Sequence, residues 1–189
     1  MTEVFGYYEV VTGPVSSPIS LSEAKSFLRV EYDDDDDLIT TIIASVKGIA
    51  EKITNRTLSS QTVKASFPKS EPSGKIFIHS SPVTSINSVK LYDSESDSFI
   101  ATADYTFTPD NSTPSIDFGT YIPLDSNIPF TIEVEFVSGG VSPDMIQAMK
   151  NHINFLYENR GDVTSVGSLA APVESMMVYK LNRIIPGFA

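Results

Sequence analysis

The longest regular hydrophobic pattern in the chain runs from Asp34 to Asn55. Projected at 100° per residue, one side of this stretch carries apolar side chains, which are Leu38, Ile39, Ile42, Ile43, Val46, Ile49, Ala50 and Ile53. The pattern predicts an amphipathic helix with a broad apolar stripe. Burial contributes roughly 1.5–3 kcal/mol per such side chain, and ordering the backbone costs about 1–2 kcal/mol per residue. The helix must therefore dock on a partner made by the rest of the chain.

A shorter helix precedes it. Ser20 followed by Glu23 forms a capping box, so a helix is expected from Leu21 to about Leu28. The acidic run Asp33–Asp37 then leads into the long helix, where negative charge in the first turn favours the positive end of the helix dipole.

Two further helices are predicted near the C-terminus. Ser142, with Pro143 after it, predicts the start of the first. Its apolar face holds Met145, Ile146, Met149, Ile153, Leu156 and Tyr157, and Ala148 and Phe155 lie away from that face. Gly161 ends it, and a polar loop is expected over Gly161–Ala171. The last helix runs from Val173 to about Ile184, with Met177, Leu181 and Ile184 aligned.

Short β-rich runs separated by proline fill the middle of the chain. Alternating side-chain character predicts strands at Thr62–Phe67, Lys75–His79, Ile86–Tyr92, Ser98–Ala101, Tyr105–Thr108, Ser115–Phe118 and Phe130–Val137, and Val4–Val11 is a further strand. The predicted class is α+β: a small bundle of about four helices with an inserted antiparallel β lobe. Residues 1–58 and 138–189 are expected to form the helical core with its N-terminal strand, and residues 59–137 the lobe.

Composition narrows the function. A net charge of −11 and a pI near 4.5 argue against wrapping nucleic acid, which requires clustered lysine and arginine. The chain has no cysteine, so disulfides and thiolate metal sites are excluded. The first residues show no signal peptide pattern, and no apolar run approaches the length of a membrane span.

Candidate chemistry is sparse. Counted from Asp33 as an EF-hand loop, the positions that need glycine and glutamate hold Leu38 and Ala44, so the acidic run is interpreted as a solvated helix start. His79 and His152 fit no zinc or protease motif, and structural or surface roles are expected for both. No phosphate-binding glycine loop occurs. The chain is not expected to be an enzyme, and no cofactor or metal is expected.

Phe155 stands out because it lies opposite the apolar face of its predicted helix. One reading is that the β lobe or the last helix covers it. The other reading is a contact between subunits, because aromatic residues are enriched in interface cores. The sequence leaves both readings open.

The stretch ISLSEAKSFLRVEYDDDDDLITTIIASVKGIAEKITNRTL combines a short helix, an acidic run and a long helix, and it resembles the opening of the tailed-phage head–tail connector (adaptor) family. The positions that carry this resemblance are Leu21, Ala24, Lys25, Leu28, Arg29, Val30, Asp33–Asp37, Arg56 and Leu58. FLYENRG is similar to the helix end of the family, and SPVTSINSVKLYD to a segment of its β region. The resemblance covers most of residues 4–161, and the C-terminal helix departs most.

The resemblance implies a structural virion protein that forms a ring, commonly of about a dozen copies, under the portal after DNA packaging. Its expected partners are the portal protein, tail or tail-completion proteins and further copies of itself. DNA would pass through without sequence-specific binding, no membrane is involved, and the location is the head–tail junction after assembly in the host cytoplasm. The alternative is a non-ring tail-completion or capsid-accessory protein.

The expected structural and interface residues are Arg29, Phe155, Tyr157, Arg160, Met176, Met177, Tyr179, Leu181, Ile184, Ile185 and Phe188. Near the end of its helix, Tyr157 can bury its ring and Arg160 can reach a carboxylate or the last carbonyls. The C-terminal segment holds more apolar residues than one side of a short helix can bury, so attachment to the portal or to a neighbouring subunit is predicted. Alternatively, the last helix closes the core of its own subunit.

Overall fold

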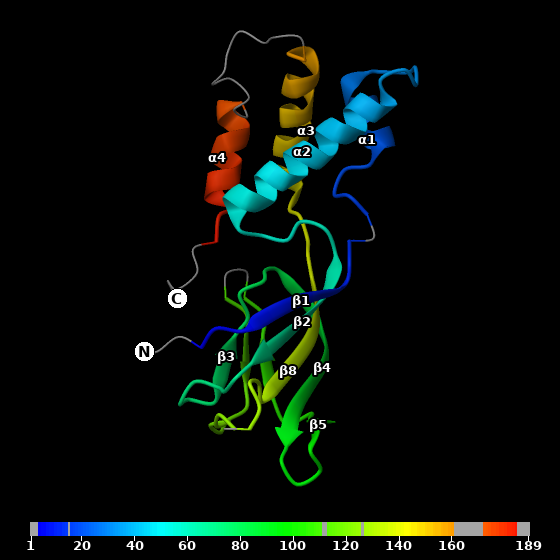
Figure 1. The fold of residues 1–189 in the computed structure, drawn as a ribbon. Coiled ribbons are helices and arrows are strands. Elements are labelled where there is room, and N and C mark those ends of the chain that lie inside the picture. The colour runs from blue at the N-terminus through cyan, green and yellow to red at the C-terminus, as the bar shows by residue number, and fades with distance from the viewer. Residues whose placement is uncertain (1–3, 15, 111–112, 126, 161–171, 185–189) are drawn as a thin grey trace. The chain divides into compact units, whose positions relative to one another are not determined.

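The computed structural model describes residues 4–14, 16–110, 113–125, 127–160 and 172–184. The chain divides into two compact units, whose elements are labelled in Figure 1. We call the unit built from Met1–Val15 and Ser60–Gly139 the β unit, and the unit built from Ser16–Ser59 and Gly140–Ile184 the helical unit. Helices and antiparallel sheets confirm the α+β class.

The helical unit contains α1 (Leu21–Leu28), α2 (Asp36–Thr54), α3 (Pro143–Glu158) and α4 (Val173–Leu181). In Figure 1, α3 and α4 run side by side and α2 crosses both, in agreement with the contacts that α2 makes with each. α1 packs against α2 and α3. None of the helices in the described part of the chain is long and apolar enough to cross a lipid bilayer.

The predicted stripe of α2 forms the centre of the helical core. Its buried members are Ile39, Ile42, Ile43, Val46 and Ala50, and Ile53 packs against them. They meet the apolar face of α3, whose buried members are Met145, Met149, Ile153 and Tyr157. Leu38, in the first turn of α2, differs from the prediction because 36% of it remains exposed.

The helix starts follow the sequence signals with one difference. The capping box of α1 is present, because Ser20 accepts a hydrogen bond from the Glu23 backbone and the Glu23 carboxylate accepts one from the Ser20 N–H. Ser142 occupies the N-cap position of α3 with an extended backbone, but its side chain makes no capping hydrogen bond. Pro143 begins α3 as predicted.

The β unit contains two antiparallel sheets. The first has the order β1-β2-β8-β4-β5, formed by Tyr7–Thr12, Gln61–Phe67, Ile132–Ser138, Val83–Asp93 and Ser98–Ala101. The second has the order β3-β7-β6, formed by Lys75–Phe77, Ser115–Asp117 and Thr106–Thr108. Alternate residues of the central strand β8, namely Ile132, Val134 and Phe136, are buried in the core of this unit.

The N-terminal strand corrects the expected grouping, which placed it with the helices. β1 pairs antiparallel with β2, from Tyr7 opposite Ser66 to Thr12 opposite Thr62, and it falls in the β unit. A strand satisfies its backbone N–H and C=O groups through a neighbouring strand, and the described residues of the helical unit contain none. Gly6 allows the approach, since a Cβ there would lie 2.6 Å from the ring of Phe67.

Candidate interaction site

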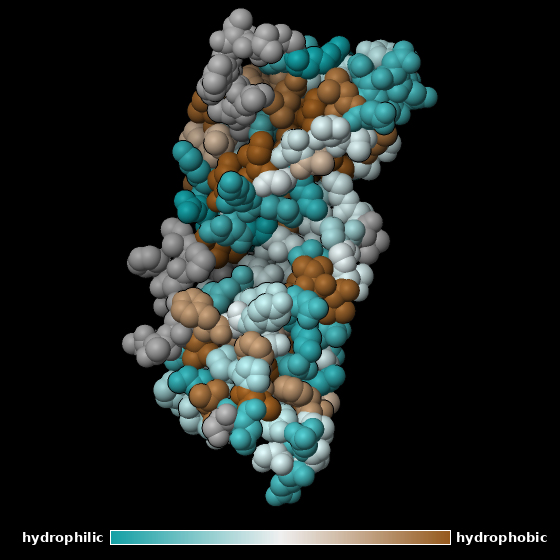
Figure 2. Space-filling model, viewed as in Figure 1, coloured by the Kyte–Doolittle hydropathy of each residue, from teal (hydrophilic) through white to brown (hydrophobic). Residues whose placement is uncertain are grey.

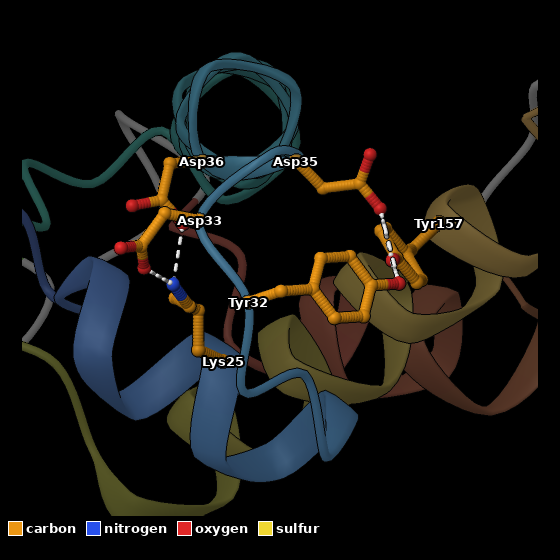
Figure 3. A network of polar contacts seen from close by, with 6 residues as sticks. All are labelled: Lys25, Tyr32, Asp33, Asp35, Asp36 and Tyr157. Carbon is orange, nitrogen blue, oxygen red and sulfur yellow. Dashed lines mark hydrogen bonds and ion pairs between the residues drawn. The ribbon is translucent and has the colours of Figure 1, made fainter.

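The acidic run ties α1 to the start of α2. The ammonium group of Lys25 on α1 lies 2.6 Å from a carboxylate oxygen of Asp33 and 2.6 Å from one of Asp36 (Figure 3). These contacts raise the pKa of Lys25 above its usual value, and the hydrogen bond from Lys25 lowers the pKa of Asp33. Both shifts favour the charged forms. The ion pairs of Lys25 with Asp33 and Asp36 therefore hold the loop after α1 and the start of α2 close to α1.

A second cluster joins the same loop to the end of α3. The Tyr157 hydroxyl donates to the Asp35 carboxylate, and the Tyr32 hydroxyl lies 3.3 Å from the Tyr157 hydroxyl (Figure 3). The hydrogen bond to Asp35, followed by the contact with Tyr32, raises the pKa of Tyr157. Because its carboxylate faces Tyr157, Asp35 occupies the N-cap position of α2 without making a side-chain capping bond.

Arg160 lies over this cluster. Its guanidinium carbon is 4.2 Å from the centre of the Tyr157 ring, and its Nη1 group donates a hydrogen bond of 3.2 Å to the Tyr157 backbone carbonyl. A nitrogen of the same group lies 3.9 Å from Asp35, and 46% of the Arg160 side chain remains exposed. Arg160 therefore reaches both a carboxylate and a terminal carbonyl, the two kinds of partner that its place at a helix end predicted.

The interpretation of the acidic run as a solvated helix start holds for the exposed Asp33, whose side chain nevertheless contacts Lys25, and is wrong for the partly buried Asp35 and Asp36. Asp33, Asp35 and Asp36 have side-chain partners on α1 or α3. Within the residues that the structure describes, no group of three or more histidine, aspartate or glutamate side chains is placed to hold a metal ion. The run acts as a connection between three helices.

The side of α4 that faces α3 packs in the hydrophobic core and makes two polar contacts there. Ser175 Oγ donates to the Ala148 carbonyl at 2.8 Å, and the Tyr179 hydroxyl lies 3.3 Å from Nδ1 of His152. Ser175, Tyr179, Ala148 and His152 are all buried. Burial lowers the pKa of His152 to about 4 and raises the pKa of Tyr179. Ala148, expected to lie away from the core face, is covered because α4 packs on that side of α3.

The end of α2 fixes the chain that follows α4. The backbone N–H of Ile184 donates to the Thr54 carbonyl at 2.8 Å, and the Asn55 side chain donates to the Ile184 carbonyl at 3.1 Å. Arg56 Nε donates to the Asn182 carbonyl at 2.7 Å. Ile184 is buried, so it belongs to the structure of its own subunit.

The opposite side of α4 is apolar and exposed. Val173, Met177 and Leu181, spaced four residues apart, are exposed to 72%, 59% and 83%, and we call them the α4 stripe. Hydrophobic surface appears over α3 and α4 in Figure 2. Met176 is half-buried between the stripe and the buried side. The predicted alignment of Met177 and Leu181 holds, but Ile184 lies beyond the end of α4 and is buried.

Phe155 lies in a groove of about 480 Å³ between α1, α3 and the start of α4. The groove is lined by Phe27, Asn151, Asn154, Phe155, Glu158, Asn159, Pro172 and Glu174. The four lining positions on α3 are spaced as one helix face, opposite its core face. Phe155 is half-buried, with the start of α4 on one side and the open groove on the other.

The remaining predicted positions are separate from these clusters. Arg29 is exposed and ends α1 in the left-handed conformation, with φ of 58°, while its backbone N–H donates to Lys25 and Ser26 carbonyls. Ile185, Phe188 and the segment 161–171 lie outside the described residues.

Two features escaped the sequence analysis. The groove joins Phe27 and Phe155, which lie on different helices, and no local pattern connects them. The burial of Ser175 and His152 was only weakly indicated by the sequence, because small or polar side chains occur both at helix contacts and on exposed faces. Their burial can be inferred only when the helix that packs against them is known.

The sequence model of the phage gp6-like head-tail connector protein family matches residues 18–115. No curated protein matches the chain. Among solved structures, a chain from the neck of an empty GTA particle, computed with C6 symmetry, is similar at 18% identity and a TM-score of 0.73, covering 95% of this chain and 96% of that one. A chain from the virion of the native gene transfer agent (GTA) particle gives 18% identity and a TM-score of 0.72, covering 94% and 95%. A chain from the neck of the native GTA particle, computed with C12 symmetry, is similar at 18% identity and a TM-score of 0.65, covering 96% of this chain and 98% of that one.

Proposed function

Because the chain belongs to the phage gp6-like head-tail connector family, we propose that it forms an adaptor ring between the portal and the tail and extends the DNA channel after packaging. The observation that carries the proposal is the family match, which begins before α1 and ends in β7. It is supported by a fold shared over nearly the whole chain with neck proteins of particles computed with C6 and C12 symmetry. A ring of about a dozen copies is part of this proposal, and the C12 symmetry with which one of these necks was computed supports it.

The charge of the chain suits this function. A net charge of −11 disfavours adhesion to the DNA phosphates, which are neutralised by clustered lysine and arginine in proteins that hold DNA. DNA would then pass through the ring without sequence-specific contact. In this proposal the protein acts through geometry and symmetry, with no catalytic step and no cofactor.

We further propose distinct tasks for the two units. The helical unit would be a small bundle that forms the connector core, and the β unit would be a lobe inserted into it that is free to meet tail proteins. The domain division expected from the sequence, residues 1–58 and 138–189 against 59–137, is kept in this proposal with β1 moved to the lobe.

We propose that each copy attaches to the portal or to a neighbouring copy through the α4 stripe. A deletion of residues 173–189 would be an ambiguous test, because it removes Tyr179 and Ser175, which are buried against α3. The double variant Met177→Ser, Leu181→Ser changes only exposed side chains. It should melt as the wild type does and lose assembly, whereas unaltered assembly would show that the stripe is not a contact.

The function is tested with the purified portal of the same phage or prophage. Native mass spectrometry of the mixture should show a ring of copies bound to one portal ring. A complex with only one or two copies, or binding to tail-completion proteins in the absence of portal, would favour the non-ring alternative. No complex with either partner would reject the proposal.

A further inference from the structure

We propose that the groove beside Phe155 in one copy receives the α4 stripe of the next copy, so that these two surfaces form the lateral contact of the ring. This inference rests on the ring proposed above and names the residues that would join its subunits.

The groove combines an aromatic surface with acidic side chains. Phe27 and Phe155 supply apolar surface on α1 and α3, and Glu158 and Glu174 place two carboxylates among its lining side chains. Both glutamates are exposed. A partner that fits must therefore offer apolar side chains together with positive charge.

The second half of α4 has this chemistry. Met177 and Leu181 are exposed to 59% and 83%. Lys180, which precedes Leu181 on α4, and Arg183, two residues beyond the end of the helix, are also exposed. The chain contains 13 basic residues against 24 acidic ones, so two neighbouring cations stand out against its acidic composition. Methionine adapts to irregular partner surfaces, and lysine and arginine can meet the two glutamates at the edge of the contact.

A copy cannot fill its own groove with these residues. Ser175 and Tyr179 turn one side of α4 toward α3, which leaves Met177 and Leu181 on the side facing away. The groove, in contrast, is lined by the α3 face that carries Phe155. Two different surfaces on one subunit that fit each other make a head-to-tail contact, and a head-to-tail contact generates a ring when the rotation closes.

The absence of cysteine allows a direct test with two proteins, each carrying one substitution. Phe155→Cys protein and Leu181→Cys protein are mixed, assembled on purified portal and oxidised. We expect a disulfide-linked pair that contains one copy of each, visible by mass as a shift from one chain to two. Because each protein has a single thiol, such a mixed pair can form only between copies.

The matched control replaces Leu181→Cys with Leu124→Cys, since Leu124 is also exposed but lies in the β unit. The control mixture should remain unlinked. If wild-type protein forms the ring on portal but the Phe155→Cys and Leu181→Cys proteins do not link, this inference is overturned and the ring stands. A link from Leu181→Cys to portal would also overturn it and assign the stripe to the portal. If wild-type protein forms no ring, the proposed function itself fails.

Charge reversal gives an independent test. Lys180→Glu with Arg183→Glu should abolish the ring on portal, and Glu158→Lys with Glu174→Lys should do the same. A chain carrying all four substitutions should recover the ring, because each reversed groove then meets a reversed stripe. Thermal melting checks that every variant is folded. Loss of the ring in the two pairs without recovery in the fourfold variant would contradict the contact.

Discussion

α2 and α4 use their apolar residues in opposite ways. α2 buries its stripe, from Ile39 to Ala50, against α1, α3 and α4. α4 buries Ser175 and Tyr179 and leaves Val173, Met177 and Leu181 exposed. α2 is held mainly by packing, whereas α4 combines packing of Tyr179, Met176 and Val178 with the polar contacts of Ser175 and Tyr179.

The difference teaches that an apolar stripe locates a contact without identifying the partner. On α2 the partner is the subunit itself, since the stripe lies in the helical core. On α4 the side that carries Ser175 and Tyr179 faces the subunit, so the exposed apolar side is left for another surface. The following experiments test this contrast, beginning with the largest expected effect.

Truncating one apolar residue of the stripe on α2 and one of the stripe on α4 should give very different losses of stability. Ile39→Ala removes a side chain with no exposed surface, and it should lower the free energy of unfolding by about 2–5 kcal/mol. Leu181→Ala removes a side chain that is 83% exposed, and it should change that free energy by less than about 0.5 kcal/mol. Urea denaturation measures both. A comparable loss for Leu181→Ala would show that its own chain covers the stripe in solution.

The polar contact beneath α4 should make stability depend on pH. Burial lowers the pKa of His152 from its ordinary 6.5 to about 4 in the folded protein. Between these values the unfolded chain takes up a proton that the folded chain does not, so the free energy of unfolding is constant above about pH 6.5 and falls as the pH drops toward 4. From about pH 7 to about pH 5 the loss should be on the order of 2 kcal/mol.

Urea denaturation over this pH range measures the loss. His152→Gln should remove most of it, because the group that titrates is gone. His79→Gln, a histidine substitution in the β unit, serves as the control and should retain it. An unchanged pH dependence in His152→Gln would show that other groups are responsible.

The acidic run offers a comparison within the start of α2. Asp35→Asn weakens the acceptor of the Tyr157 hydroxyl and removes the charge near Arg160, so it should lower the free energy of unfolding by about 1–2 kcal/mol. Asp34→Asn, an exposed neighbour in the same loop, should have almost no effect. Chemical denaturation of the two variants, compared at one pH, is the measurement. Equal effects would mean that only the total charge of the run matters.

Arg160→Ala should lower stability less than Asp35→Asn does. The side chain is 46% exposed, and its contacts are a ring face, one backbone carbonyl and a carboxylate 3.9 Å away. Solvent screens such contacts, so the expected loss is about 1 kcal/mol or less. If denaturation shows that loss but assembly on portal fails, Arg160 also acts between subunits; Arg160→Lys then tests whether charge alone is sufficient.

Much of the fold could be predicted from the sequence, because the relevant signals are local. The Ser20–Glu23 box places α1, and alternation along residues 130–137 identifies β8 within two residues at its start and one at its end. Which side of α4 is buried could not be predicted. An apolar stripe normally marks the core, and only the positions of Ala148 and His152 on α3 show why Ser175 and Tyr179 take that place.

The candidate site was predictable in part. Phe155 is conspicuous in the sequence because it departs from the periodicity of its own helix. The groove around it was not, since Phe27 and Glu174 reach it from helices that are distant along the chain. The Lys25 and Asp35 contacts also depend on tertiary placement, because a run of five aspartates does not show which member finds a partner.

The pairing of β1 with β2 and of β8 with both β2 and β4 has a consequence for synthesis on the ribosome. β1 leaves the ribosome first and has no partner strand until β2 follows, with all of α1 and α2 made in between. β2 and β4 can pair with β8 only after β8 has been made, and α2 can pack against α3 only after α3 has been made. At about 5–20 residues per second, early segments remain incomplete for on the order of ten seconds. The nascent chain therefore exposes the stripe of α2 for most of its synthesis, and its folding is completed only when the last third of the sequence has emerged.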